Sequence, residues 1–184
     1  LPGTRAVYTR HGLLDLVSEY GRNGVAEVVC KLDRANGGLG ILRFSSIEDV
    51  YNQAVLGSLC FPFVVQPFVA RSRDIRVVLL GAYVEAYERS NPNNFRNNLH
   101  CGGESAPWEP DSIQLDLCRA IMERAGFAYA HIDLLIASDG TSYLNEINLR
   151  GGLKGASIDQ QGYLNRVSSI HERFVAELEG GENR

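Results

Sequence analysis

Residues 144–155 read LNEINLRGGLKG, and the interpretation of the whole chain depends on them. Glu146 and Asn148 stand two positions apart in an apolar run, so in a β-strand their side chains project from the same face. Residues 130–137 form a second strand-like run, and the SDGT between the two runs carries the Asp-Gly pair typical of a two-residue hairpin turn. The pattern predicts a β-hairpin.

The register of this hairpin follows from counting. A turn at residues 139–140 places Asp133 opposite Glu146 and His131 opposite Asn148. Directly opposed side chains have Cβ atoms about 4.5–5.5 Å apart. Two carboxylates that close repel each other unless a cation, a proton or a basic side chain lies between them.

Two interpretations of the acidic pair are open. In the first, a hard divalent cation binds between the acids, because carboxylate and amide oxygens, together with phosphate oxygens, are the ligands that Mg²⁺ accepts. In the second, the hairpin face is solvated and an Arg or Lys lies between the acids. Gly151, Gly152 and Gly155 favour the first, since such glycines describe a loop of close approach rather than a strand end.

Composition excludes several classes of function. The chain has 184 residues, 45% of them hydrophobic, which is enough for one or two compact units. Its net charge of −4 argues against a broad surface for nucleic acid or an anionic membrane, and no apolar run approaches the roughly 20 residues that span a bilayer. Four widely spaced cysteines without a C-x-x-C motif favour reduced thiols in a cytoplasmic protein. The LPGT start lacks an initiator Met, so we expect a segment of a longer protein.

A second glycine-rich loop lies nearer the start of the chain. Residues 25–32 predict a buried strand, residues 33–40 read DRANGGLG, and residues 41–44 predict the next strand. Backbone N–H groups of such a loop can contact phosphate oxygens, and Lys31 at the strand end adds a positive charge. A plain turn with a solvated lysine is the alternative, because the sequence lacks the Gly-Lys-Ser/Thr of a Walker loop.

Apolar periodicity predicts four helices and further strands. The helices cover residues 11–20 with a stop at Gly21, residues 45–57, residues 111–125 and residues 157–178. Residues 61–69 predict a strand that is either a plain edge strand or a support for adenine, and residues 74–89 predict a hairpin around Gly81. Asp74 and Arg76 share a face of its first strand. The long loop of residues 91–103 contains Arg96, which can bind a phosphate or carboxylate through two hydrogen bonds.

The order of these motifs resembles one family, the ATP-grasp ligases of the RimK type, which are glutamate ligases that modify ribosomal proteins and cofactors. The matching motifs are Lys31-Leu32 with Gly38-Leu39-Gly40, Asp74-Ile75-Arg76, Phe95-Arg96-x-Asn98-Leu99-His100-x-Gly102-Gly103 and Glu146-x-Asn148. The resemblance implies an α+β ATP-grasp fold, in which two α+β subdomains with mainly antiparallel sheets clasp a nucleotide. Residues 1–65 would form the small subdomain with the glycine loop, and residues 66–184 the C-terminal subdomain with the metal site. The family's N-terminal domain is expected before residue 1.

The resemblance also implies a role for each candidate site residue. The ATP phosphates would be covered by Lys31, Gly37, Gly38 and Gly40. The adenine would be held by Gln66, Pro67, Phe68 and Val69, and the ribose by Asp74. Magnesium would be bound by Asp133, Glu146 and Asn148. The transferred phosphoryl group and the acyl phosphate would face Arg76, Arg96 and Asn98, and the substrate would face Arg150, Gly152 and Lys154.

The implied reaction is the ATP-dependent joining of a carboxylate to an amine through an acyl phosphate, with glutamate as the first candidate substrate. The implied cofactors are ATP and Mg²⁺, as two ions that Mn²⁺ can replace. The implied partners are an amino acid or small carboxylate, an amine acceptor and the N-terminal domain of the same protein, with self-association left open. The alternatives are a non-catalytic nucleotide-binding module of the same fold and a different ATP-grasp peptide ligase, such as a dipeptide ligase. Residues 149–152 and Lys154 depart from the family pattern, and Arg150 and Lys154 suit a more acidic acceptor.

Overall fold

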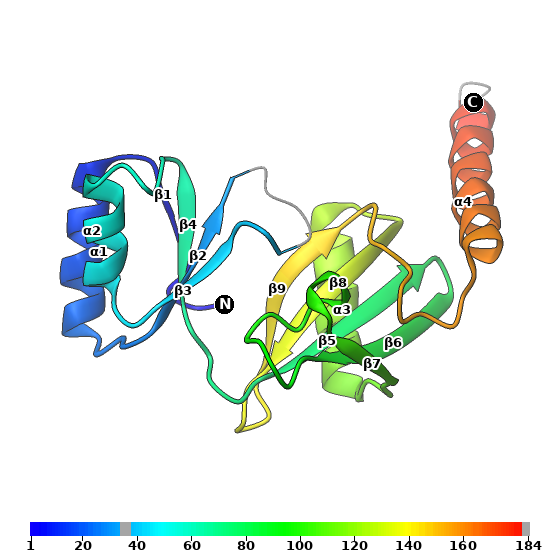
Figure 1. Ribbon diagram of the computed structural model, residues 1–184. Coiled ribbons are helices and arrows are strands. Elements are labelled where there is room, and N and C mark those ends of the chain that lie inside the picture. Colours follow the sequence, from blue (N-terminus) through cyan, green and yellow to red (C-terminus); the bar gives the residue numbers. More distant parts are fainter. Residues whose placement is uncertain (34–37, 182–184) are drawn as a thin grey trace. The chain divides into compact units, whose positions relative to one another are not determined.

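The computed structural model describes residues 1–33 and 38–181, and the chain divides into two compact units, Leu1–Arg71 and Ser72–Arg184 (Figure 1). The sequence-based boundary after residue 65 falls inside strand β4 (Phe63–Pro67). Each unit has its own antiparallel sheet and its own core, so each is described by itself. Within the described residues, no helix combines the length and apolar character needed to cross a membrane.

The first unit is a four-stranded sheet of order β1-β4-β2-β3, with two helices packed together on one of its faces (Figure 1). Its elements are β1 (Arg5–Val7), α1 (Arg10–Arg22), β2 (Val28–Leu32), β3 (Ile41–Phe44), α2 (Ile47–Val55) and β4. Leu13 and Tyr20 of α1 and Val50 of α2 pack against Cys30 and Val65 of the sheet. The opposite face of the sheet carries Lys31 and Gln66 beside Val29 and Val64.

The end of α1 differs from the prediction. Gly21 lies inside the last turn, and the helix is capped by Asn23, whose backbone N–H donates to the Glu19 carbonyl. The residue with left-handed backbone is Gly24, at φ +64°. The predicted stop at Gly21 was therefore wrong, because the conformation that requires glycine occurs three residues later.

The second unit is a five-stranded antiparallel sheet of order β7-β6-β5-β8-β9. Its elements are β5 (Arg73–Leu80), β6 (Tyr83–Ser90), the 3₁₀ helix η1 (Leu99–Cys101), β7 (Glu104–Pro107), α3 (Ser112–Ala125), β8 (Tyr129–Ile136), β9 (Ser142–Asn148) and α4 (Gln160–Gly181). The predicted hairpin around Gly81 is confirmed, as is the helix that ends at Gly126. The short edge strands β1 and β7 were not predicted.

The two faces of this second sheet carry different residues. On one face, Ile75, Val77 and Ile132 pack with Cys118 of α3. On the other face, an apolar cluster that includes Val78 packs against α4 through Ile170. Alternation along β5 and β8 places Asp74, Arg76 and Asp133 on this second face, because they keep the parity of Val78 and its partner His131.

The β8–β9 hairpin closes through a different turn from the one predicted. The Ala137 N–H donates to the Thr141 carbonyl (2.9 Å), and the Gly140 N–H donates back to the Ala137 carbonyl (2.9 Å). The loop therefore contains residues 138–140, one residue more than the predicted two. The left-handed Gly140, at φ +86°, fits a three-residue hairpin loop.

A β-bulge in β9 compensates for the longer loop. Leu134 pairs with Leu144, whereas Asp133 pairs with Glu146, so Asn145 is an extra residue in β9. The predicted opposition of Asp133 and Glu146 is confirmed only because these two one-residue shifts cancel.

Thiol labelling tests the two cores. Cys30 and Cys118 are fully buried, one in each unit, and burial raises the pKa of Cys30 to about 12 and that of Cys118 to about 11. Cys60 is exposed. Because the thiolate is the reactive form, iodoacetamide at pH 8 should modify Cys60 and leave Cys30 and Cys118 unmodified until denaturant is added, as followed by peptide mass spectrometry. Rapid modification of Cys30 or Cys118 in the native protein would contradict the described packing.

Candidate functional site

A row of four polar side chains crosses the second sheet. Tyr87 of β6 pairs with Arg76 of β5, Arg76 pairs with Asp133 of β8, and Asp133 pairs with Glu146 of β9. Cross-strand partners share a face of the sheet, so the four side chains follow one another on the face that also carries the α4 cluster. The predicted catalytic Arg76 and the predicted metal ligands Asp133 and Glu146 are thus brought together.

Asp133 is held by two arginines. Arg76 donates from Nε to Oδ1 (2.7 Å) and from Nη2 to Oδ2 (2.8 Å), and Arg89 donates from Nη2 to Oδ2 (2.9 Å). The Asp133 side chain is only 2% exposed. A carboxylate this deeply buried stays ionised only when cations and hydrogen bonds replace its lost hydration, and the two guanidinium groups supply both.

Arg89 also binds a second carboxylate. Its Nη2 and Nε donate to Asp74 Oδ1 at 2.5 and 3.2 Å, so one guanidinium bridges Asp74 and Asp133. We refer to Asp74, Arg76, Arg89 and Asp133 as the charge quartet. It contains two positive and two negative side chains, and it joins strands β5, β6 and β8.

The pKa values of the two carboxyl groups in the quartet are shifted in opposite directions. Burial raises the pKa of Asp74, and the neighbouring Asp133 charge adds to this effect, while Arg89 opposes it only in part. Burial would also raise the pKa of Asp133, but hydrogen bonds and charge from Arg76 and Arg89 outweigh it and leave the pKa of Asp133 below its usual value. Asp133 is therefore the more firmly ionised of the two acids, as a metal ligand requires.

Glu146 lies at the other side of Asp133 and is exposed. Within the part of the chain that the structure describes, Glu146 makes no ion pair. Asn148 stands opposite His131, two residues along the same face of β9. The donor set of Asp133, Glu146 and Asn148 is all oxygen, so its chemistry fits Mg²⁺. The described residues contain no group of three His, Cys, Asp or Glu side chains placed to hold a metal. The set proposed here is of a different kind, because its third member is the amide of Asn148.

His131 fills the space beside the quartet as a neutral, buried ring. It is 0% exposed, and neither ring nitrogen has a hydrogen-bond partner among the described residues. Burial, together with the charge of Arg76, lowers the pKa of His131 to about 4. Its ring packs edge-on to Tyr163 of α4, with centroids 5.5 Å apart. We predict from the sequence that His131 does not bind the metal.

The glycine-rich loop after β9 approaches this histidine closely. A Cβ atom built on Gly151 would overlap the His131 ring, whereas a Cβ on Gly152 would meet nothing within 4 Å. Only the first of these two glycines is required by packing. The predicted role of Gly152 and Arg150 in binding substrate therefore stays a prediction, with open space beside Gly152.

Lys154 connects this loop to the long loop after β6. Its Nζ donates to the Leu99 carbonyl (2.9 Å), and a Cβ on Gly155 would crowd Leu99 and Ser105. Glu85 holds the next segment, since its carboxylate accepts from the backbone N–H groups of Ser157 and Ile158. The two loops that carry the predicted substrate and catalytic residues are thus fixed to each other.

The long loop has its own internal order. Asn98 caps η1, because its Oδ1 accepts from the Cys101 N–H (2.9 Å). The Arg96 guanidinium lies over the Phe95 ring at 4.4 Å. Gly103 is required by packing, since an added Cβ would meet the backbone carbonyls of residues 97, 98 and 90. These contacts position Arg96 and Asn98, and their catalytic roles stay predictions.

Apart from Asp74, which lies in β5 of the second unit, the nucleotide-binding candidates belong to the first unit. Lys31 of β2 stands opposite Val64, and Gln66 of β4 stands opposite Val29, so Lys31 and Gln66 share the face that is turned away from the helices. They are two residues apart along the paired strands, or roughly 7 Å. This arrangement fits a ligand that extends along the sheet.

The glycine loop follows β2. It closes through the Leu32 N–H, which donates to the Gly40 carbonyl (2.8 Å), and through the Ile41 N–H, which donates to the Gly38 carbonyl (3.3 Å). Gly38 has φ +82°. Gly37 lies outside the described residues.

Pro67 and Phe68 lie at the end of β4. The Phe68 N–H donates to the Glu27 carbonyl (2.9 Å), and the Arg43 guanidinium covers the Phe68 ring at 4.0 Å. Val69 follows directly in the chain. Their assignment to the adenine stays a prediction.

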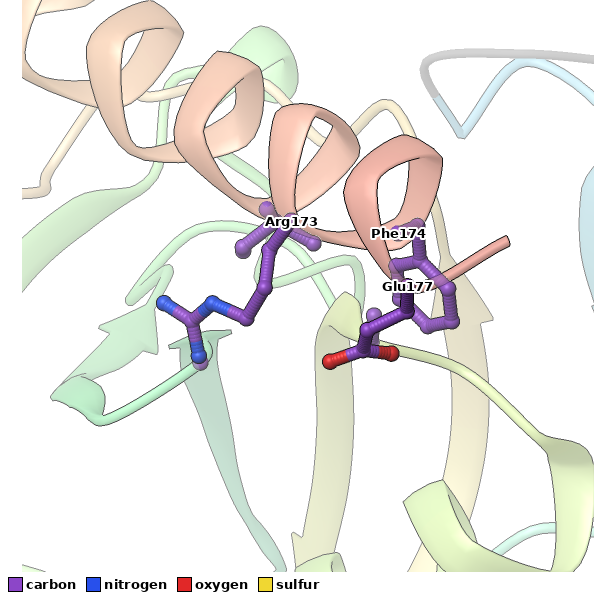
Figure 2. A pocket seen from close by; sticks show the side chains of 6 residues that line it. Arg173, Phe174 and Glu177 are labelled. Carbon is purple, nitrogen blue, oxygen red and sulfur yellow. The ribbon is translucent and has the colours of Figure 1, made fainter. Parts of the chain in front are cut away.

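A separate hollow of about 200 Å³ lies beneath α4. Figure 2 shows Arg173, Phe174 and Glu177 projecting from α4 toward it, and Gly81, Ala128 and Ile170 also line it. It contains none of the predicted site residues. The charge quartet and not this hollow is therefore the candidate site.

Comparison with known proteins identifies the family of this chain. A family model described as the RimK-like ATP-grasp domain matches residues 9–165. The chain belongs to this family. The RimK-type resemblance inferred from the motifs is confirmed.

Two relatives and one solved structure illustrate the relationship. The chain is 28% identical over 142 residues to "Glutathione synthetase" of Agrobacterium fabrum, covering 70% of this chain and 42% of that protein. It is 28% identical over 186 residues to "Probable alpha-L-glutamate ligase" of Rhodopirellula baltica, covering 97% and 44%. The chain thus spans less than half the length of these relatives. It is also similar to the structure of "ATP-grasp ligase PsnB complexed with phosphomimetic variant of minimal precursor, Mg, and ADP", with TM-score 0.63, 17% identity and coverage of 91% and 52%. The predicted α+β ATP-grasp fold is confirmed.

Arg89 is the site residue that the sequence analysis missed. The signal was present in the predicted hairpin, because counting across the turn at Gly81 places Arg89 opposite Asp74. The sequence-based prediction placed Asp74 on one face with Arg76, which lies two residues along the same strand. In the structure each of these residues has a partner on a neighbouring strand.

Arg89→Met should strongly destabilise the second unit. Removing one partner of a buried ion pair leaves uncompensated charge, here on two carboxylates, and typically costs about 3–5 kcal/mol. Arg73→Met is the matched control, because Arg73 makes a similar two-point pair with Glu88 between the same strands at an exposed position, where a loss below about 1 kcal/mol is expected. Urea unfolding measures both, and equal losses would contradict the role given to the quartet.

Gly151→Ala should destabilise the protein by about 1–3 kcal/mol, because the added methyl group overlaps the His131 ring. Gly152→Ala is the control: it meets open space and should leave the free energy of unfolding unchanged or raise it by up to about 1 kcal/mol. Thermal unfolding distinguishes the two variants. A stable Gly151→Ala protein with an unshifted His131 resonance would show that the loop is not packed as described.

Proposed function

We infer that the chain supplies the catalytic part of an ATP-dependent carboxylate–amine ligase that acts through an acyl phosphate, with an amino acid such as glutamate as one substrate. One observation carries this proposal: Arg76, Asp133 and Glu146 stand side by side on one face of the sheet, with Asn148 two residues further along β9. Phosphoryl transfer needs cations and metal ligands in fixed positions more than it needs a nucleophilic side chain.

The proposed reaction has two steps. A carboxylate oxygen of the first substrate attacks the γ-phosphorus of ATP, the bond to the bridging oxygen breaks and ADP leaves. The amine nitrogen of the second substrate then attacks the carbonyl carbon of the acyl phosphate, inorganic phosphate leaves, and the nitrogen loses a proton. Glutathione synthetase and alpha-L-glutamate ligase, the names of two relatives, are consistent with a substrate of this class.

The residues of this chain would act mainly by binding and orientation. Asp133, Glu146 and Asn148 would hold Mg²⁺, which when bound neutralises charge on phosphate oxygens. The ADP and Mg present in the PsnB structure support ATP and Mg²⁺ as cofactors. A second Mg²⁺ ion is part of the proposal. Lys31, Gly38 and Gly40 would cover the phosphates, with Gln66 to Val69 at the adenine and Asp74 at the ribose. Arg76, Arg96 and Asn98 would face the transferred group.

Substrate choice is assigned to the loop after β9. Arg150, Gly152 and Lys154 lie on it, and their two positive charges suit an acidic acceptor. Lys154 has one donor committed to the Leu99 carbonyl. An ammonium group has three donors, so an acceptor carboxylate can share it.

Release of ADP by the intact protein tests the function. ADP and phosphate should form only when Mg²⁺, an amino acid and an amine acceptor are all present, with glutamate assayed first. Glu146→Gln should reduce this rate by at least about 100-fold, because it removes one of the two carboxylate charges that would hold the cation, while circular dichroism and unfolding stay unchanged since Glu146 is exposed. An unchanged rate in Glu146→Gln would contradict the assignment of Glu146 as a metal ligand. Tight ATP binding without turnover under any substrate would instead favour a non-catalytic module.

A further inference from the structure

The two arginines of the charge quartet hold Asp133 in different ways. Arg76 binds it with two parallel hydrogen bonds, one to each carboxylate oxygen. Arg89 binds it through a single nitrogen and shares that nitrogen with Asp74. Because of this asymmetry, the two arginines differ in how easily each can dissociate from Asp133.

Arg89 stays in place because its departure would leave two carboxylates without their shared cation. It is the cation between the buried Asp133 and the half-buried Asp74, and its own side chain is 7% exposed. If Arg89 left, Asp74 would lose its guanidinium and would face the charge of Asp133 directly. Two unscreened carboxylates in a buried site repel strongly, so Arg89 stays in place whatever else binds.

Arg76 is bound to one carboxylate and is the more exposed of the two, at 14%. Its two-point contact covers the edge of Asp133 where both oxygens present the lone pairs that a metal ion would use. A cation and the Arg76 guanidinium therefore compete for the same edge of the carboxylate. After Arg76 leaves, Asp133 still keeps Arg89.

We propose that Arg89 is a permanent counter-charge of Asp133 and Arg76 an exchangeable one, which leaves the carboxylate when a divalent cation binds there. Arg89 is then a positioning residue for the metal ligand, because it fixes Oδ2 while Oδ1 becomes available. Arg76 acts as a placeholder that keeps the buried carboxylate ionised before the cation arrives.

The exchange links metal binding to the position of Arg76, and this consequence rests on the proposed ligase function. A guanidinium released from Asp133 has two forked donors ready for a planar or tetrahedral oxyanion, such as the phosphoryl group. The same event that fills the metal site would thus free the arginine that faces the transferred group.

Binding of Mn²⁺, followed by electron paramagnetic resonance with and without ADP, tests the exchange without using turnover. Arg76→Lys keeps the positive charge but cannot cover both oxygens. If Arg76 competes with the cation, Arg76→Lys should bind Mn²⁺ about tenfold more tightly than the unmodified chain, and Arg76→Gln at least as tightly as Arg76→Lys. Equal or weaker binding by both variants would overturn the proposal.

Arg73→Gln is the control for charge. It removes one positive charge from the same strand, but its partner is Glu88 and not Asp133. Its Mn²⁺ affinity should stay within about twofold of the unmodified chain, because exposed charges are screened. An equal gain in Arg73→Gln and Arg76→Gln, with none in Arg76→Lys, would show a general charge effect and would contradict the exchange.

Nuclear magnetic resonance of the arginine Nε–H groups gives a second measurement, in which the cation is added to the unmodified chain. The Arg76 and Arg89 signals are assigned from the lysine variants and followed while Mg²⁺ and ADP are added. The Arg76 Nε–H should shift and lose protection from solvent exchange, and the Arg89 Nε–H should stay protected. Cation binding with an unmoved Arg76 signal would overturn the proposal and leave the ligase function standing. Absence of Mn²⁺ binding in every variant, with ADP present, would remove the metal assignment and the exchange together.

Discussion

The second unit depends on one constraint: Asp133 is an ionised carboxylate almost entirely removed from water. Burying such a charge without partners would cost several kcal/mol, so the fold must bring cations to it. Arg76 comes from the neighbouring strand and Arg89 from the strand beyond that. Satisfying this carboxylate therefore fixes the register of three strands at once, and a shift of one residue would send these side chains to the opposite face.

The sequence predicted the local parts of this arrangement well. The hairpin around Gly81 and the helix that ends at Gly126 are both set by local signals, namely a glycine with left-handed backbone at a turn or a cap. The two short edge strands were missed because β1 has three residues and β7 four, too few for an alternating pattern to be recognised.

The non-local parts could be predicted only in part. The opposition of Asp133 and Glu146 came from counting across an assumed two-residue turn, and the structure reaches it through a three-residue loop and a bulge at Asn145. Neither irregularity has a clear signal in the sequence. The pairing of Arg76 with Asp133 joins residues 57 positions apart, and no hairpin count connects them. Likewise, nothing in the pair Gly151-Gly152 reveals that only the first contacts His131.

Under the proposed exchange, the two interpretations of the acidic pair describe one site in two states. The second interpretation expected a solvated face with an Arg or Lys between the acids. In the structure Arg76 does bind Asp133, but this carboxylate is buried and not solvated. The functional interpretation expected a cation between Asp133 and Glu146, and their opposition together with the RimK-like ATP-grasp family supports it. A carboxylate positioned for a metal must also remain ionised and in place when the metal is absent. An arginine that binds the same two oxygens meets that requirement, since it keeps the carboxylate ionised and in position. This arginine must then dissociate when the metal binds. The counter-charge is thus a condition for burying a metal ligand within a sheet, and its presence does not argue against the metal.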